Sequence, residues 1–294
     1  MARLRFLRTC GSASHVRTEG RVLRMSTVSS GKKTGGTRPR ALVTGGSAGI
    51  GAAFADRLAH DGYDLVIVAR DRDRLESRAH DLRERAGVQV EVLPADLTEP
   101  AELHIVEGVV ADAQLDLLVN NAGFGTIGKF AELDADREEA EIRLNVIALI
   151  RLTRAALPGM VQRNSGAIIN VSSMAALQPA PFNATYGATK AYVNSFTEAL
   201  HEELRDTGVR VQALCPGFTR TEFQERAGVD VSRVPELAWM SAEAVVEASL
   251  AGLRRGELIC VPGVANRVFS TVVGAVPRGL TRRLAGVLVR SSLT

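Results

Sequence analysis

Between residues 40 and 263, short apolar runs alternate with segments that have the spacing of amphipathic helices. Hydrophobic residues at consecutive positions are typical of strands that are buried on both faces. The runs are RALVTGG (40–46), DLVIVAR (64–70), VQVEVLPADL (88–97), LDLLVNNAG (115–123), GAIINVSS (166–173), VRVQALCPG (209–217) and ELICVPG (257–263). Right-handed crossovers through the intervening helices would cover both faces of a parallel sheet. We therefore expect an α/β fold with a doubly wound parallel sheet of about seven strands.

Length and charge suggest three parts. The 294 residues, 46% of them hydrophobic, suffice for one substantial core and do not require two domains. The formal charge of +3 divides into +9 for residues 1–40, −11 for 41–257 and +5 for 258–294. We expect a basic flexible extension over 1–39, one folded domain over 40–263 and a basic, apolar helical tail over 264–294. The acidic body argues against a nucleic-acid-binding core.

The N-terminal residues have the composition of a mitochondrial transit peptide, rich in Arg and Ser and nearly free of acids. A disordered arm, or a start placed upstream of a true start at Met25, is the preferred alternative.

Three unpaired cysteines (Cys10, Cys215 and Cys260) fit a reducing cytoplasm. The histidines show no metal-ligand spacing, so we expect no metal site. We also expect no spanning helix, because no run of about 18 apolar residues exists.

A glycine-rich segment, TGGSAGIG (44–51), follows the first strand and opens the first helix. Gly45 permits a tight turn, Gly49 lets the backbone approach a pyrophosphate, and Gly51 lets the helix pack closely on the strand. The helix N-terminus supplies free N–H groups and the positive end of a dipole. A purely structural turn is the alternative, but the strand–turn–helix context favours dinucleotide binding.

Arg70 ends the second expected strand, where related folds place a carboxylate that binds the ribose hydroxyls of NAD. A guanidinium cannot accept a hydrogen bond, but it pairs well with a 2′-phosphate. The sequence therefore favours NADP(H) over NAD(H), with Arg72 and Arg74 close enough to assist. Asp71 leaves an alternative open, because its carboxylate could bind a ribose hydroxyl if the turn rotates.

Two further polar segments follow expected strands. Asp96, after the third strand, could accept a hydrogen bond from the adenine amine, or it could be a helix N-cap, for which Thr98 is better placed. NNAG (120–123), after the fourth strand, puts short side chains where backbone contacts to a cofactor are expected. The carboxyl ends of parallel strands meet at one edge of a sheet, so these segments predict one site.

Tyr186 and Lys190 lie four residues apart, on one face of a helix expected over 184–207, and Ser173 ends the fifth strand. Taken alone, such a pair is more often a packed tyrosine beside a solvated lysine. Beside a nicotinamide, however, a phenol can protonate the oxygen of a carbonyl that receives a hydride. The lysine and an oxidised nicotinamide would lower the phenol pKa from about 10. Ser173 would orient and polarise the carbonyl.

The chain resembles the short-chain dehydrogenase/reductase family over about residues 40–263. The matching segments are TGGSAGIG, NNAG, RLNV, INVSS, YGATK and PGFTRT, in the same order and with 13 residues from Ser173 to Tyr186. The resemblance implies a single-domain Rossmann-like catalytic domain with a tetrad of Asn145, Ser173, Tyr186 and Lys190. In that family the asparagine positions a water that relays protons from the lysine.

The resemblance further implies an NADP(H)-dependent oxidoreductase that reversibly reduces a ketone or 3-oxoacyl group of a hydrophobic substrate, with Tyr186 as proton donor. The chain after Pro216 would hold the nicotinamide carboxamide. Ser47 stands where some NADP-using relatives carry a basic residue, which leaves Arg70 as the main phosphate contact. The expected cofactor-binding residues are Thr44, Gly45, Ser47, Gly49, Ile50, Gly51, Arg70, Asp96, Leu97, Asn121, Ala122, Gly123, Tyr186, Lys190, Pro216, Gly217, Thr219 and Thr221.

Longer segments (PFNATYGATKAYVNSFTEALHEEL and SAEAVVEASLAGLRRGELICVPG) resemble DltE-like bacterial reductases, a branch similar to reductases of 3-ketoacyl groups, hydroxysteroids and long-chain lipid ketones. A steroid or other secondary-alcohol dehydrogenase is one alternative. A non-catalytic nucleotide-binding regulator on the same fold is another, and the complete tetrad argues against it. Trp239 falls in the variable substrate loop, where it would line the pocket or anchor the loop.

The tail, 264–294, mixes Val, Leu and Phe with Arg and has no acid, which is typical of a helix on an anionic membrane surface. A helix packed over the substrate cleft or a partner subunit is the preferred alternative. We expect a cytoplasmic protein, with peripheral membrane contact left open. Analogy with the family suggests a homodimer or homotetramer formed through the two long helices.

Overall fold

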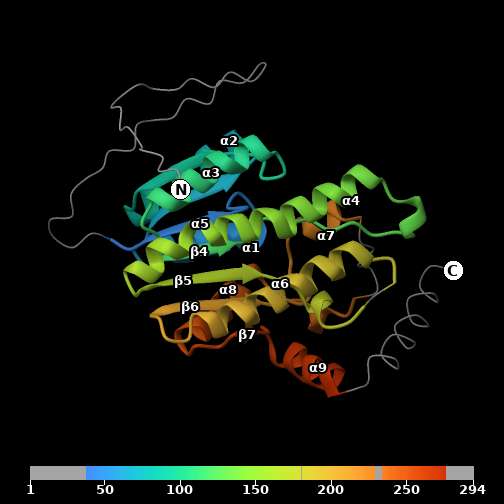
Figure 1. The fold of residues 1–294 in the computed structure, drawn as a ribbon. Helices are drawn as coiled ribbons and strands as arrows, with labels where there is room; N and C mark the ends of the chain where they lie inside the picture. The colour runs from blue at the N-terminus through green and yellow to red at the C-terminus, as the bar shows by residue number, and fades with distance from the viewer. Residues whose placement is uncertain (1–37, 180, 229–233, 276–294) are drawn as a thin grey trace, which may run out of the picture. The chain divides into compact units, whose positions relative to one another are not determined.

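Seven parallel strands form one sheet in the order β3-β2-β1-β4-β5-β6-β7 (Figure 1). The computed structural model describes residues 38–179, 181–228 and 234–275. The strands are β1 (Arg40–Thr44), β2 (Asp64–Ala69), β3 (Val90–Pro94), β4 (Leu117–Asn120), β5 (Gly166–Val171), β6 (Val209–Leu214) and β7 (Ile259–Cys260). The expected single-domain, Rossmann-like parallel sheet is therefore confirmed.

Helices follow each strand and lie on both faces of the sheet. The longer ones are α1 (Gly49–His60), α2 (Arg72–Ala86), α3 (Pro100–Asp112), α5 (Leu149–Gln162), α6 (Ala184–Glu203), α8 (Ala242–Arg254) and α9 (Val264–Ala275). The shorter ones are η1 (Phe130–Glu132), α4 (Ala135–Ile142), the π-helix η2 (Arg143–Ala148), η3 (Met174–Ala176), α7 (Phe223–Arg226) and η4 (Glu236–Ala238). The expected extension, 1–39, lies outside the described residues except for Arg38 and Pro39, and so does the tail beyond α9.

The alternation of side chains along each strand explains the unbroken apolar runs. In β1, Ala41 and Val43 belong to a core that α1, α2 and α8 cover, whereas Leu42 belongs to a core covered by α3, α5 and α6. Successive side chains of a strand point to opposite faces, so both sets must be apolar when both faces are buried.

The last crossover departs from the right-handed rule used above. α1 connects β1 to β2, and α8 connects β6 to β7 in the opposite direction across the sheet. Both helices nevertheless pack on the same face, so their crossovers have opposite hands. The other crossovers all have the same hand, which the general rule makes right-handed. They pass through α1, α2, α3, α5 and α6.

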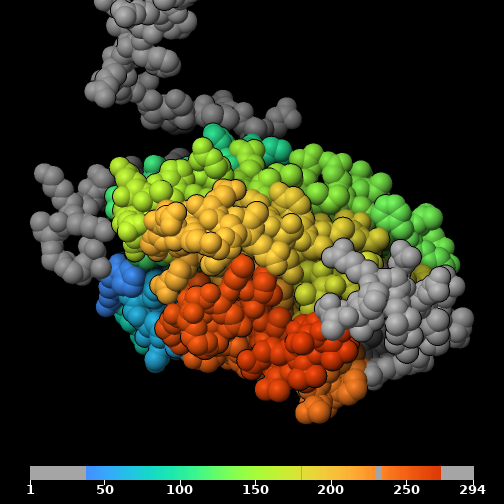
Figure 2. All heavy atoms as spheres, turned by 60° about the horizontal axis from the view of Figure 1, so that its bottom comes forward, coloured from blue at the N-terminus to red at the C-terminus, as the bar shows by residue number. Residues whose placement is uncertain are grey.

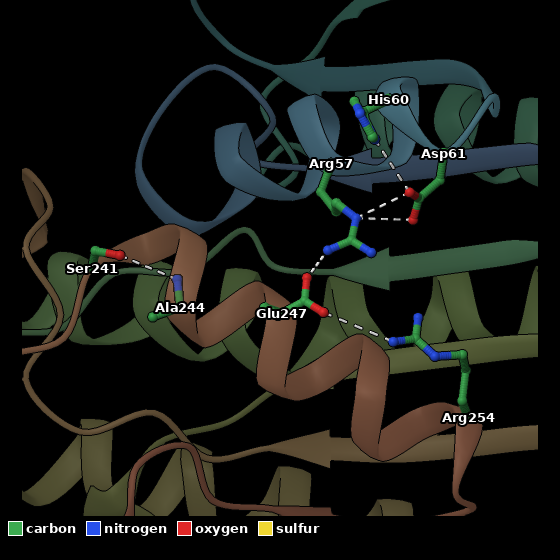
Figure 3. Close-up of polar contacts among 7 residues, drawn as sticks. All are labelled: Arg57, His60, Asp61, Ser241, Ala244, Glu247 and Arg254. Atoms are coloured by element: carbon green, nitrogen blue, oxygen red, sulfur yellow. Dashed lines mark hydrogen bonds and ion pairs between the residues drawn. The ribbon is translucent and has the colours of Figure 1, made fainter.

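Charged residues join α1 to α8 on that shared face (Figure 3). Arg57 pairs with Glu247 of α8 and, at 3.0 Å, with Asp61, while Glu247 lies 3.9 Å from Arg254. A cavity of about 860 Å³ lies between α1, α2 and α8. None of the expected site residues lines it, so we do not connect it with the chemistry.

α4, η2 and α5 form one helical run, Ala135–Gln162, which by length and composition could cross a membrane. The sequence predicted no such segment. Leu152, Ala156 and Met160 of this run are packed in the core shared with α3 and α6. Core helices of soluble proteins pass the same test, so the run is weak evidence for a membrane span.

Candidate active site

The glycine loop after β1 is shaped to leave the N-terminus of α1 accessible. Gly45 and Gly49 have φ of 67° and 55°, in the left-handed region that favours glycine. A Cβ on Gly51 would lie 2.2 Å from the carbonyl oxygen of Gly45, so only glycine fits there. The N-cap residue Ala48 makes no side-chain hydrogen bond, and the first turn holds no acidic residue. This helix end therefore suits an anion such as a pyrophosphate.

Thr44 and Asn121 tie the glycine loop to the end of β4. The Thr44 hydroxyl accepts hydrogen bonds from the backbone N–H groups of Asn121 and Ala122, both at 3.0 Å. The Asn121 side chain donates to the Thr44 carbonyl at 2.9 Å. These side chains, expected beside the cofactor, thus hold the loops that would contact it.

Arg70 lies just beyond β2, which ends one residue earlier than expected. Its side chain is 75% exposed, and its nearest acid is Asp96 at 3.8 Å. Asp71 caps α2, because its carboxylate accepts a hydrogen bond of 3.0 Å from the backbone N–H of Arg74. The Arg74 guanidinium binds Glu222 with two hydrogen bonds, at 3.2 and 2.6 Å. Arg70 is therefore the more available of these two guanidinium groups for a phosphate.

Asp96 accepts hydrogen bonds from the backbone N–H and the hydroxyl of Thr98, at 2.9 and 2.7 Å. The N-cap of α3 is Glu99, which makes no side-chain cap, and Pro100 opens the helix. Thr98 is therefore not the helix cap that the sequence suggested, because its hydroxyl is used by Asp96. Leu97 is buried beneath this turn.

Tyr186 and Lys190 lie one turn apart on α6, and the Lys190 ammonium is 5.6 Å from the centre of the Tyr186 ring. Lys190 is 4% exposed and donates a 2.8 Å hydrogen bond to the Val171 carbonyl at the end of β5. Burial lowers the pKa of Lys190 to about 8, and the charges of Glu141 and Cys215 oppose this change. The lysine is thus a buried cation, not a solvated one.

Ser173 lies two residues beyond β5 and reaches the Tyr186 phenol. Burial raises the pKa of Tyr186 to about 12, against a hydrogen bond with Ser173 that lowers it. The Ser173 hydroxyl also accepts a 3.1 Å hydrogen bond from the backbone N–H of Ala175, which fixes its place at the start of η3. A hydroxyl, a phenol and an ammonium therefore meet at the carboxyl edge of the sheet.

Asn145 lies in the π-helix η2 and is 1% exposed. Its side-chain oxygen accepts from the Phe124 N–H at 3.2 Å, and its side-chain nitrogen donates to the Phe124 carbonyl at 2.9 Å and the Thr189 hydroxyl at 3.1 Å. The side chain joins the loop after β4 to α6, one residue from Lys190. A π-turn within an α-helix is frequent at functional sites.

The family model for short chain dehydrogenases matches residues 39–231. The chain belongs to the short-chain dehydrogenase family. It is therefore an oxidoreductase of that family, whose members use NAD or NADP. Solved short-chain dehydrogenases similar to it include complexes with NADPH and with NAD.

Two solved structures and one curated enzyme illustrate the similarity. A Sphingobium yanoikuyae short-chain dehydrogenase in complex with NADPH is 42% identical, with a TM-score of 0.76 over 83% of this chain and 95% of that one. The bulky-bulky ketone specific alcohol dehydrogenase of Comamonas testosteroni is 33% identical, with a TM-score of 0.70 over 82% and 95%. The very-long-chain 3-oxoacyl-CoA reductase of Rattus norvegicus is 33% identical over 71% of this chain and 67% of its own length. For the bovine reductase of that name, the chain spans 60% of the length.

Three consecutive residues of this short-chain dehydrogenase, Thr221, Glu222 and Phe223, reach three different parts of the site; we call them the strap. A Cβ on Gly49 would lie 3.1 Å from the Thr221 methyl group, and Glu222 binds Arg74. The Phe223 ring lies 5.5 Å from that of Tyr186. The sequence did not single out Glu222 or Phe223, because they come from a loop without a recognisable pattern.

The segment after β6 begins with Pro216, whose carbonyl accepts a 3.0 Å hydrogen bond from the N–H of Met174. The buried Thr219 donates to the Gly217 carbonyl at 3.1 Å. A Cβ on Gly217 would lie 2.7 Å from Asn266 of α9, so α9 covers this turn.

Trp239, in the same region, lies half-buried with its ring 5.5 Å from Phe218 and 5.3 Å from the Arg220 guanidinium carbon. Of the two roles considered for it, these contacts favour anchoring the loop.

Proposed function

We propose that this short-chain dehydrogenase is an NADP(H)-dependent reductase of a ketone or 3-oxoacyl group on a hydrophobic substrate, which runs in reverse as a secondary-alcohol dehydrogenase. One observation carries the proposal: the Tyr186 phenol, the Ser173 hydroxyl and the buried Lys190 ammonium lie together at the carboxyl edge of the sheet. The uncapped N-terminus of α1 and its glycine loop open at the same edge.

In reduction, Ser173 donates a hydrogen bond to the substrate carbonyl and fixes its orientation. Tyr186 donates its proton to the same oxygen, which becomes the product hydroxyl. A pKa raised by burial keeps the phenol protonated at neutral pH, as a donor requires. The cofactor, when bound, supplies or accepts the hydride.

Oxidation requires the phenolate form of Tyr186. Lys190, at 5.6 Å from the ring, stabilises the phenolate electrostatically when it is protonated. Asn145 is one residue from Lys190 through Thr189, and we propose that it positions a water that relays protons from the lysine, as family resemblance implies.

NADP(H) is proposed over NAD(H) on two observations. Arg70 exposes a guanidinium just beyond β2, the strand paired with β1, and guanidinium groups bind phosphates in a bidentate manner. The carboxylate of Asp71, which could have favoured NAD, is used as the N-cap of α2. The similar Sphingobium enzyme in complex with NADPH supports the same choice.

A bulky, apolar carbonyl compound is the proposed substrate class. The names of two similar enzymes, a very-long-chain 3-oxoacyl-CoA reductase and a bulky-bulky ketone specific alcohol dehydrogenase, support it. The aromatic ring of Phe223 lies against Tyr186, so apolar surface is present where the substrate carbon chain would leave the reacting carbonyl.

The proposal also includes peripheral contact of α9 with an anionic membrane. Val264, Val268, Phe269 and Val272 on this helix are 49–71% exposed, whereas the polar Asn266 packs against Gly217. The helix thus presents its apolar face outward. Figure 2 shows the atoms of α9, coloured red, at the surface of the molecule. Residues 258–294 contain five Arg and no acid, which suits anionic lipids.

A homodimer or homotetramer is proposed through α4–α5 and α6. Ile142, Ile147 and Val161 on the first helical run and Tyr192 on α6 are large apolar side chains that are 39–44% exposed. Burial of such side chains between subunits would be favourable. The molar mass in solution, measured by light scattering, tests this part of the proposal.

Replacement of Tyr186 by Phe tests the proposed function. Y186F should lower turnover of a bulky ketone by roughly 10²–10⁴-fold, because only the proton donor is removed, and NADPH binding measured by fluorescence should stay nearly unchanged. Tyr192, which is 42% exposed and stacks on Phe196, provides a matched control, since Y192F should keep full activity. Substantial turnover by Y186F would refute the proposal.

A further inference from the structure

Two glutamates that the chemistry above does not use are buried on α4. Glu141 is 0% exposed and Glu138 is 8% exposed. One carboxylate oxygen of Glu141 accepts hydrogen bonds from the backbone N–H and the hydroxyl of Thr126, both at 2.8 Å. One oxygen of Glu138 accepts a hydrogen bond from the Thr185 hydroxyl. Buried carboxylates are costly unless they are paired, so this pair requires an explanation.

The two threonines that donate hydrogen bonds to these carboxylates both lie next to Tyr186. Thr185 directly precedes the tyrosine on α6. Thr126 directly follows Gly125, and a Cβ on Gly125 would lie 2.9 Å from the Tyr186 ring. The two carboxylates therefore hold the chain on two sides of the proposed proton donor, one through the loop after β4 and the other through α6.

The loop that Glu141 holds also lies against the buried Lys190, because a Cβ on Gly123 would lie 3.5 Å from the lysine nitrogen. Among the described residues no carboxylate lies within ion-pair distance of Lys190, yet the charge of Glu141 raises the pKa of that lysine. The charged or titratable groups that act on this cluster are Glu138 on α4, Lys190 and Tyr186 on α6, and Cys215 after β6. An ammonium removed from water needs a nearby negative charge to stay protonated.

Glu138 limits how readily Glu141 ionises. Burial raises the pKa of Glu141 to about 7, and the negative charge of Glu138 adds to the rise. The other oxygen of each carboxylate, Oε1, is buried and has no hydrogen-bond partner among the described residues. The negative charge of Glu138 thus opposes ionisation of Glu141.

We propose that Glu141 is a positioning residue for the reaction proposed above: its carboxylate fixes the loop 123–126 against Tyr186 and Lys190 and places a buried negative charge in their cluster. Glu138 holds Thr185 and regulates the charge of Glu141. This inference rests on the proposed roles of Tyr186 and Lys190, and it adds a source of charge that the motifs of the family did not point to.

Glu141→Gln separates the two parts of this role. The Gln carbonyl oxygen can still accept the hydrogen bonds from Thr126, but the charge is lost. The pKa values of Lys190 and Tyr186 should both fall, and reduction needs both groups protonated. The alkaline limb of kcat/KM for ketone reduction should move to lower pH, so that activity at pH 8 relative to pH 6 falls roughly five- to tenfold. The KM for NADPH should not change.

Glu138→Gln provides the control. Its amide oxygen can still accept from Thr185, and Glu141, with a pKa of about 7, is already ionised at the pH of the alkaline limb, so the limb should stay where it is in the wild type. A limb at the wild-type position in E141Q as well, with activity lowered equally at all pH values, would indicate a merely structural role and overturn the inference. If E141Q does not fold, Thr126→Val removes one of the hydrogen bonds that lower the pKa of Glu141 and should move the limb to lower pH; an unchanged limb in T126V then overturns the inference.

The activity of Y186F distinguishes failure of this inference from failure of the proposed function. If Y186F is active, the proposed function is wrong. If Y186F is inactive and both Gln variants keep the pH profile of the wild type, only the role of the glutamates is wrong.

Discussion

Arg74 of α2 donates two hydrogen bonds, at 3.2 and 2.6 Å, to the carboxylate of Glu222 in the strap. The contact joins the side of the site that would hold the cofactor adenosine to the loop that would hold the substrate. Arg74 holds the pKa of Glu222 below its usual range, so the carboxylate is ionised at neutral pH. The Glu222 carboxylate therefore already pairs with Arg74, which is one of the two guanidinium groups, with Arg70, that could bind a 2′-phosphate.

Glu222→Gln should release Arg74 for the phosphate. An exposed ion pair contributes about 0.2–1 kcal/mol, so the KM for NADPH should fall roughly 1.4- to fivefold and the KM for NADH should stay unchanged. Glu225→Gln removes the same charge from an exposed position of α7 and serves as a control. Equal changes for both cofactors would show that Glu222 acts only through the loop.

Arg70→Ala tests the cofactor preference directly. A charged hydrogen bond contributes about 1.5–3 kcal/mol, so kcat/KM with NADPH should fall roughly 10- to 150-fold, while the value with NADH should change little. Arg205 has an exposed side chain that pairs with Glu202 and is not among the expected cofactor-binding residues, which makes R205A a suitable control. A wild-type enzyme that uses NADH as well as NADPH would contradict the proposed preference.

Those parts of the fold that depend on local pattern could be predicted from the sequence. Consecutive apolar residues such as Ala41, Leu42 and Val43 predict a strand buried on both faces, and the structure confirms it. The hand of the last crossover could not be predicted, because no local pattern fixes the face of the sheet on which α8 packs. That face is set by tertiary contacts with α1, among them the pair of Arg57 and Glu247.

The candidate site, like the fold, has some features that could be predicted from the sequence and others that could not. The helical spacing of Tyr186 and Lys190 and the place of Ser173 after a strand are local, so their proximity could be predicted. Glu141 is tied to the site by its hydrogen bonds with Thr126, 15 residues earlier in the chain, and no periodicity of α4 marks it as a buried acid. Asn145 is buried within η2, a π-helix that the surrounding sequence does not signal.

The apolar face of α9 predicts binding to anionic vesicles. The wild-type protein should sediment with vesicles that contain phosphatidylglycerol, and less with vesicles of phosphatidylcholine alone, because Arg267 flanks the apolar face. Replacement of Val268 and Phe269 by Ser should abolish sedimentation and leave turnover of a soluble ketone unchanged. F130S removes another exposed apolar side chain, which is 64% exposed on η1, and should sediment like the wild type. Sedimentation that does not depend on Val268 and Phe269 would contradict the proposed contact.

Glu141 makes the stability of the protein depend on pH in a defined direction. Its pKa rises from 4.5 to about 7 on folding, chiefly through burial, so the native state binds a proton that the unfolded state releases. The stabilisation is complete below pH 4.5 and is lost as the pH rises through about 7. The free energy of unfolding should fall between pH 5 and pH 8 by up to about 3 kcal/mol more in the wild type than in E141Q. Urea unfolding of both proteins at the two pH values measures this difference. E139Q, at an exposed position of the same helix, should behave like the wild type; parallel pH dependence in E141Q would mean that Glu141 titrates at its ordinary pKa in the folded protein.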